Sequence, residues 1–157
     1  MPSAIDPTGD AAIVGADSAS AAVGLRYLVL AQRVRKTLDR HMLASGLSLA
    51  RWKVLEVLQG KGSIRQKSLA QELGLAERSV TQAVEGLASD GLVERTADPA
   101  DGRAKLVTLT DEGAAVLAAS TAVGEQVLRR IFGSLDHQQL VYLDGLLGAI
   151  DEAAGKV

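Results

Sequence analysis

Apolar residues recur at every third or fourth position over most of the chain, which is typical of a mainly helical protein. A helix with 3.6 residues per turn gathers residues at this spacing on one side. The pattern predicts six helices, at about residues 21–44, 48–58, 64–73, 77–89, 110–132 and 136–154. Ser48, Thr110 and Asp136 begin three of them, because their side chains can accept a hydrogen bond from the free backbone N–H groups of a first helical turn. Gln139, three residues after Asp136, completes a capping box.

The period changes between residues 92 and 109. Residues 92–96 and 105–109 are rich in branched side chains, and both segments predict short strands. The loop at residues 98–103 contains Pro, Asp and Gly, which favour a turn. Two short helices joined by a tight turn at Gly74 and followed by a β-hairpin form a winged helix-turn-helix. The expected fold is therefore mainly α with a small β wing.

Composition excludes several classes of function. The chain has 157 residues, of which 47% are hydrophobic and 3% aromatic, so the core is aliphatic. With no cysteine, thiol chemistry and disulfides are impossible. His41 and His137 lie far apart, and neither has the spacing of a metal ligand. We expect no metal, no cofactor and no enzymatic activity, because nucleophile–base pairs and phosphate-binding glycine patterns are also missing.

The sequence shows neither a run of about 20 apolar residues, as a membrane span requires, nor the features of a signal peptide. The expected location is the cytoplasm. The net charge of −2 does not by itself indicate a nucleic-acid partner. Basic residues are nevertheless concentrated in the middle of the chain. Residues 21–60 carry seven bases and two acids, residues 61–105 carry seven of each, and residues 106–157 carry three bases and seven acids.

Several segments, in order along the chain, resemble the MarR family of winged helix-turn-helix regulators. The resemblance covers about residues 22–152. The segments that carry it are Gly46–Leu55, Leu69–Leu75, Arg78–Thr81, Asp90–Arg95 and Asp98–Gly113. It implies a transcription regulator that binds DNA as a homodimer, most simply a repressor on a pseudo-palindromic operator.

Residues 1–20 consist mostly of Ala, Gly, Ser, Asp and Pro, and this composition predicts a flexible tail. The resemblance implies that residues 21–157 form a single MarR-like domain. Within it, the winged helix-turn-helix lobe spans about residues 48–110, and helices at about 21–45 and 111–154 form the dimer. The apolar stripes of these outer helices agree with a dimer, since a single chain would leave them exposed. Packing within one chain is the alternative.

Polar residues of the helix at 77–89 that face away from its apolar stripe are the candidates for reading DNA in the major groove. Arg78 suits guanine or phosphate, and Gln82 suits adenine. Hydroxyl groups can donate to phosphates. The resemblance places Arg103 at the wing tip in the minor groove, and Asp101 is expected to orient it by a charge pair. The predicted DNA-binding residues are Gln66, Lys67, Arg78, Ser79, Thr81, Gln82, Arg95, Asp101, Arg103 and Lys105.

The family is known to respond to small aromatic or phenolic anions. Tyr27, His41 and Trp52 are the candidates for such an effector pocket; the alternative is that these side chains only pack in the core or the dimer interface. Arg65 and Ala76 stand where the family usually begins a helix with a capping side chain. The balanced charge of residues 61–105 leaves open a second class of function, a winged-helix module that binds proteins and not DNA.

Overall fold

The structure is a computed structural model that describes residues 8–156, with side chains from residue 18 onward. The chain forms two compact units, Met1–Thr37 and Leu38–Val157. Helix α1 (Thr8–Ala44) runs through the boundary between them. None of the helices described is long and apolar enough to cross a membrane.

Helix α1 begins thirteen residues earlier than the sequence predicted. The expected tail at residues 1–20 is wrong for residues 8–20, which are helical, and residues 1–7 lie outside the described part. Six alanines between residues 11 and 22 explain the difference, because alanine has the highest intrinsic helix propensity. In the first unit, apolar side chains of α1 are largely exposed, among them Val23, Leu25, Leu28 and Val29.

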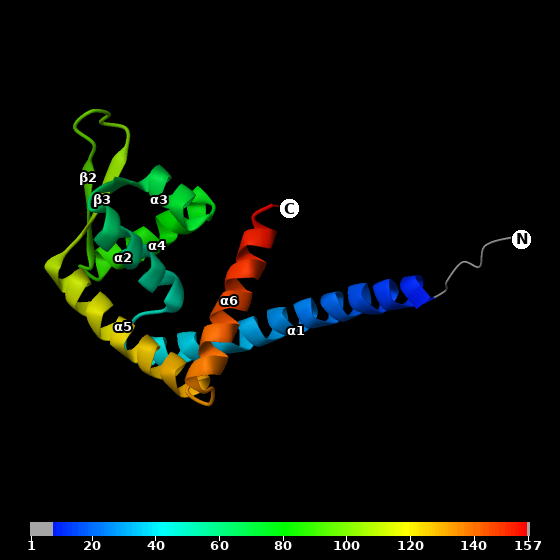
Figure 1. Cartoon of the computed structure of the whole chain (residues 1–157). Coiled ribbons are helices and arrows are strands. Elements are labelled where there is room, and N and C mark those ends of the chain that lie inside the picture. The colour runs from blue at the N-terminus through cyan, green and yellow to red at the C-terminus, as the bar shows by residue number, and fades with distance from the viewer. Residues whose placement is uncertain (1–7, 157) are drawn as a thin grey trace, which may run out of the picture. The chain divides into compact units, whose positions relative to one another are not determined.

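The second unit contains the winged helix-turn-helix (Figure 1). Its elements are α2 (Leu49–Lys61), β1 (Ile64–Arg65), α3 (Gln66–Leu73), α4 (Glu77–Ser89), β2 (Val93–Ala97), β3 (Lys105–Leu109), α5 (Asp111–Phe132) and α6 (His137–Ala154). The strands form one antiparallel sheet in the order β1-β3-β2. The predicted fold class is confirmed. The sequence missed β1, since Ile64 was assigned to the following helix and instead pairs with Val107 of β3.

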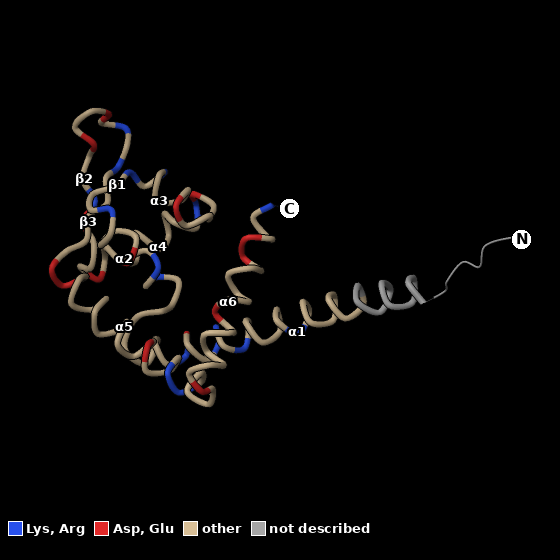
Figure 2. The backbone as a smooth tube through the Cα atoms, in the orientation of Figure 1, with Lys and Arg blue, Asp and Glu red and all other residues tan. Residues whose placement is uncertain are grey.

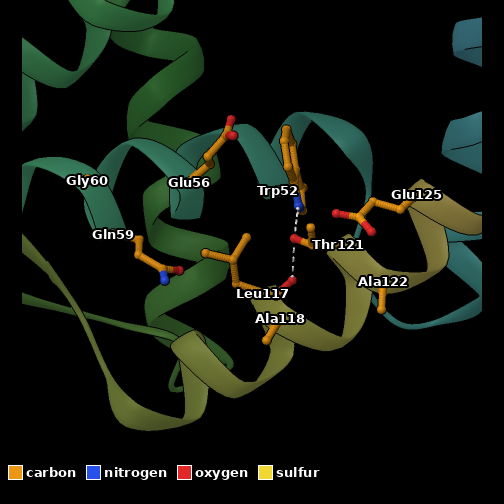
Figure 3. A pocket seen from close by; sticks show the side chains of 9 residues that line it. All are labelled: Trp52, Glu56, Gln59, Gly60, Leu117, Ala118, Thr121, Ala122 and Glu125. Atoms are coloured by element: carbon orange, nitrogen blue, oxygen red, sulfur yellow. Dashed lines mark hydrogen bonds between the residues drawn. The ribbon is translucent and has the colours of Figure 1, made fainter. Parts of the chain in front are cut away.

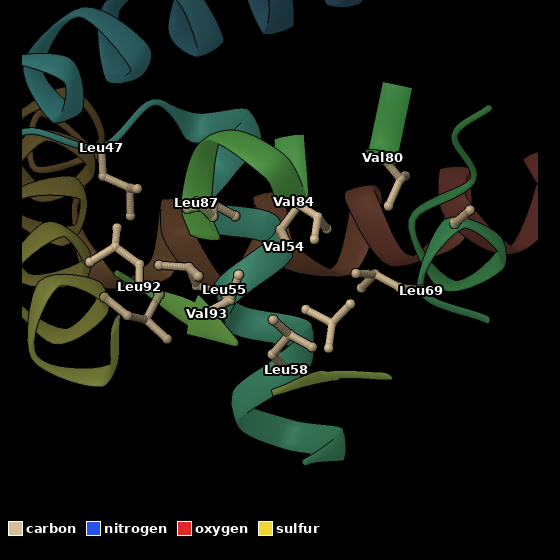
Figure 4. Packing of buried hydrophobic residues seen from close by; sticks show 13 residues of the cluster. Leu47, Val54, Leu55, Leu58, Leu69, Val80, Val84, Leu87, Leu92 and Val93 are labelled. Carbon is tan, nitrogen blue, oxygen red and sulfur yellow. The ribbon is translucent and has the colours of Figure 1, made fainter. Parts of the chain in front are cut away.

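An aliphatic core holds α2, α3, α4 and the sheet together (Figure 4). Leu55 and Leu58 of α2, Leu69 of α3 and Leu87 of α4 are each at most 1% exposed. Burying a leucine side chain contributes about 2–3 kcal/mol of hydrophobic free energy. The orientation of the two helix-turn-helix helices is therefore determined by this core.

The starts of the helices fall into two groups. Ser48, Thr110 and Asp136 accept backbone N–H groups of Arg51, Gly113 and Gln139, and the last pair is the predicted capping box. Helices α3 and α4 begin after Arg65 and Ala76, and neither has a side-chain cap. Side-chain caps thus support the scaffold helices α2, α5 and α6, whereas the helix-turn-helix pair depends on its packing.

Helix α6 differs from the other helices of this unit, because it has no buried residue. Its apolar side chains Val141, Tyr142, Leu146 and Ile150 are between 44% and 69% exposed. An apolar helix face of this kind requires a partner to cover it.

Candidate nucleic-acid interface

Helix α4 has one buried and one exposed side. Val80, Val84 and Leu87 are completely buried. The other side exposes Arg78, Ser79 and Gln82, which we call the outward face of α4. Spacings of three and four residues put these three side chains on one side of the helix. The structure therefore brings together the three residues that the sequence predicted as readers of the major groove.

Thr81, also predicted to contact DNA, forms two hydrogen bonds within the chain. Its hydroxyl donates a hydrogen bond to the backbone oxygen of Glu77 at 2.9 Å and accepts one from Nε2 of Gln66 at 2.6 Å. The only hydrogen of the hydroxyl is thus used within the protein in this structure, and the donation to a phosphate stays a prediction. Thr81 links the start of α3 to α4.

The same contact constrains Gln66. One hydrogen of its amide points to Thr81, and its Oε1 atom is buried without a hydrogen-bond partner. Lys67, the next residue, is exposed. Of the two residues at the start of α3 that are predicted to bind DNA, Lys67 is thus the one whose side chain is exposed to solvent.

The wing consists of β2, β3 and the loop between them, residues 93–109. Its tip is a compact turn, in which the backbone N–H of Asp101 donates to the oxygen of Asp98 at 3.2 Å and that of Ala104 donates to the oxygen of Asp101 at 2.8 Å. The Asp101 carboxylate accepts the backbone N–H of Arg103 at 3.1 Å. Asp101 therefore orders the loop, and the predicted ion pair with the Arg103 side chain is absent among the described residues.

Arg103 is exposed at the wing tip. Lys105 begins β3 opposite Ala97 and is also exposed. Arg95, in β2, lies 3.7 Å from a carboxylate oxygen of Glu85 on α4, so a neighbouring acid offsets its charge. Basic and acidic residues are interspersed over this unit (Figure 2). Among the basic residues of the wing, Arg103 and Lys105 form no ion pair in the part of the chain that the structure describes.

At the start of the wing loop, the structure shows a contact that sequence reasoning missed. Nε of Arg65 donates to a carboxylate oxygen of Asp98 at 2.6 Å, and the Asp98 side chain is only 8% exposed. The backbone N–H of Ala100 and the Arg65 guanidinium hold the pKa of Asp98 below its ordinary value, although burial acts in the opposite direction. The sequence feature that could have indicated this contact is Arg65 itself, which stands where a capping residue is expected.

A cleft of about 580 Å³ lies between α2 and α5 (Figure 3). Trp52 lines it and donates its indole N–H to the hydroxyl of Thr121 at 2.8 Å. Glu56 and Glu125 are its charged lining residues. His41 is not part of the lining, and Tyr27 belongs to the unit Met1–Thr37, where it is 43% exposed. Of the three predicted effector residues, one therefore lines the cleft.

The geometry contains no group of three or more potential metal ligands in the part of the chain that the structure describes. What it does offer is an exposed polar helix face beside a wing that exposes Arg103 and Lys105. Comparison with known proteins agrees with this arrangement. Residues 45–104 match the sequence model of the MarR family.

Individual relatives extend the match over most of the chain. A probable transcriptional regulator from Pseudomonas aeruginosa is 30% identical, with a TM-score of 0.70 over 82% of this chain and 96% of that one. A MarR variant from Escherichia coli, solved in complex with operator DNA, is 26% identical, with a TM-score of 0.71 over 82% and 92% of the two chains. The transcriptional regulator HosA of Escherichia coli O111:H- is 29% identical over 93 residues, which are 59% of this chain and 69% of HosA.

Fold, interface and relatives together define a winged helix-turn-helix regulator of transcription, a DNA-binding protein and not an enzyme. The chain belongs to the MarR family.

Proposed function

We propose that this chain is a homodimeric repressor that acts in the cytoplasm on a pseudo-palindromic operator. The observation that carries the proposal is the outward face of α4, Arg78, Ser79 and Gln82, exposed beside a wing whose tip exposes Arg103. A helix fits the major groove, and an arginine on a narrow loop suits the minor groove next to it.

The exposed apolar surfaces support the dimer. Helix α6 buries none of its residues within the chain, and α1 exposes apolar side chains from Val23 to Leu30. A second copy that covered these surfaces would bring two α4 helices to one duplex. We therefore expect two half-sites whose centres lie about 10 bp, one helical turn, apart.

The test begins with selection of bound fragments from genomic DNA by the purified protein, followed by binding of the selected site at several salt concentrations. A protein that contacts phosphates loses affinity steeply as salt rises. Arg103→Ala is expected to weaken binding severalfold without a change in melting temperature. Lys156→Ala, which also removes one exposed positive charge, is the matched control and should bind normally. No selected fragment, or normal binding by Arg103→Ala, would contradict the proposed interface; the first result would favour a protein-binding module.

We further propose that a small phenolic ligand occupies the cleft between α2 and α5 and releases the DNA. Its volume lies within the range of about 300–1,000 Å³ that is common for ligand sites. Trp52 supplies an aromatic surface and Gln59 a polar amide, whereas the hydroxyl of Thr121 already accepts from Trp52 and donates to the backbone oxygen of Leu117. Glu56 and Glu125 disfavour a carboxylate ligand, so a neutral phenol fits better than an aromatic acid.

Phenol and benzoate are a matched pair for this test because they differ mainly in charge. Phenol is expected to raise the melting temperature and weaken operator binding, and benzoate to do neither. In Glu56→Gln, the effects of phenol and benzoate on the melting temperature and on operator binding should become more similar. If neither compound changed operator binding or melting, release by small aromatic ligands would be wrong, and DNA binding would stand independently.

A further inference from the structure

We propose that Arg65 is a positioning residue for DNA binding, which ties the wing to the start of the helix-turn-helix through the buried Asp98. The inference rests on the DNA-binding function proposed above. In this role Arg65 does not contact DNA. It determines the position of Arg103 relative to the outward face of α4.

Asp98 is the fixed point of the wing loop. One carboxylate oxygen accepts the Arg65 guanidinium at 2.6 Å, and the other accepts the backbone N–H of Ala100 at 2.8 Å. The backbone N–H of Asp98 donates to the oxygen of Ala104 at 3.0 Å, and its own oxygen accepts the N–H of Asp101. Because every polar group of Asp98 is engaged, the loop that carries Arg103 moves with this residue.

Arg65 connects that fixed point to the rest of the lobe. Its backbone lies in β1 and pairs with Leu106 of β3, while its side chain reaches past β3 to the residue that follows β2. The next residue, Gln66, is the first of α3 and holds Thr81 of α4. Two side-chain hydrogen bonds, joined by the peptide bond between Arg65 and Gln66, therefore connect the wing loop to α4.

Arg65 stands at a position where a helix cap would be expected. Arg65 occupies the N-cap of α3, yet its side chain makes no capping hydrogen bond. A hydroxyl there would cap the helix but is too short to reach Asp98. With arginine at this position, α3 lacks a side-chain cap, but the wing loop gains an ion pair that joins it to the start of α3.

Direct phosphate binding by Arg65 is the main alternative, because a guanidinium near DNA gains from the contact whatever its neighbours. The two roles predict opposite effects of Asp98→Asn. If Arg65 bound phosphate, removing a nearby negative charge would leave affinity unchanged or raise it. If Arg65 positions the wing, the same substitution weakens operator binding despite the more favourable charge.

The experiment measures operator affinity, salt dependence and thermal melting for the full-length protein and for Arg65→Gln, Arg65→Lys and Asp98→Asn. We expect Arg65→Gln and Asp98→Asn to weaken binding about tenfold, and Arg65→Lys to retain part of the affinity. Lys61→Gln is the control, since its ion pair with Glu72 is exposed and does not involve the wing. Arg65→Lys keeps the test informative if Arg65→Gln or Asp98→Asn does not fold.

A double-mutant cycle with Arg103→Ala separates positioning from fold stability. If Arg65 acts through the wing, Arg65→Gln costs little further affinity once Arg103 is gone. The inference would be overturned if Arg65→Gln lowered affinity equally with and without Arg103. It would also be overturned by unchanged binding of folded Arg65→Gln or Arg65→Lys, or by stronger binding of Asp98→Asn. Failure of the wild-type protein to bind any DNA would instead overturn the proposed function.

Discussion

Helices α4 and α6 are both amphipathic, and they expose opposite chemistry. Helix α4 buries Val80, Val84 and Leu87 in the lobe and exposes Arg78 and Gln82. Helix α6 buries none of its residues and exposes apolar ones such as Leu147. The chain thus completes the packing of α4 by itself but leaves the apolar side of α6 uncovered.

The difference indicates two kinds of partner. A helix whose apolar side is already packed offers a polar face, which suits the edges and phosphates of DNA. A helix with an uncovered apolar face suits a second copy of the chain, since closed symmetric dimers are the commonest assemblies of soluble proteins. Substitutions in one helix should therefore abolish binding to one partner and leave the other interaction intact. Four substitutions test the roles of these surfaces.

The largest effect is expected from Leu147→Arg in α6. A charge on the apolar face should dissociate the dimer, and loss of simultaneous binding to two half-sites lowers affinity by about 1,000-fold. Analytical ultracentrifugation and operator binding measure the two effects. Gln138→Arg places the same charge at another exposed position of α6. A dimeric Leu147→Arg variant with normal affinity would show that α6 does not form the interface.

Leu87→Ala tests the packed side of α4. Leu87 is completely buried, and truncation of a core leucine costs about 3 kcal/mol of the free energy of unfolding. Chemical denaturation measures the loss. Leu75→Ala, at a position that is 50% exposed, should cost less than about 0.5 kcal/mol. Equal losses at the two positions would mean that the packing of α4 does not dominate the stability of the lobe.

Gln82→Ala tests the outward face of the same helix. We expect operator affinity to fall by about 2 kcal/mol, the range of one specific base contact, with an unchanged melting temperature. Affinity for unrelated DNA should not change. Gln138→Ala removes a matched exposed glutamine from α6 and should bind like the wild type. Uniform weakening on all DNA would assign Gln82 to the phosphate backbone.

Lys67→Ala should give the smallest effect. Its exposed side chain at the start of α3 is placed for a phosphate contact, so its removal should weaken binding to every DNA sequence alike. The slope of log affinity against log salt is expected to fall by about 1. A slope identical to that of the wild type would exclude Lys67 from the interface.

The expected starts of α2, α5 and α6 were correct because Ser48, Thr110 and Asp136 act on residues only three positions ahead. The start of α1 was wrong, since the composition of residues 8–20 was interpreted as loop-like although alanine is the most frequent residue there. Strand β1 was missed because two residues contain no period, and only pairing with β3 makes them a strand.

By itself, the sequence determined the order of the helices, the wing and the polar face of α4, because each depends on the spacing of neighbouring residues. Tertiary structure decided that Thr81 serves Gln66, that Asp101 orders its own loop, and that Arg65 reaches Asp98, 33 residues along the chain. Side-chain hydrogen bonds of this kind require atoms within about 3 Å of each other, a condition that only the packed core of α2, α3, α4 and the sheet establishes.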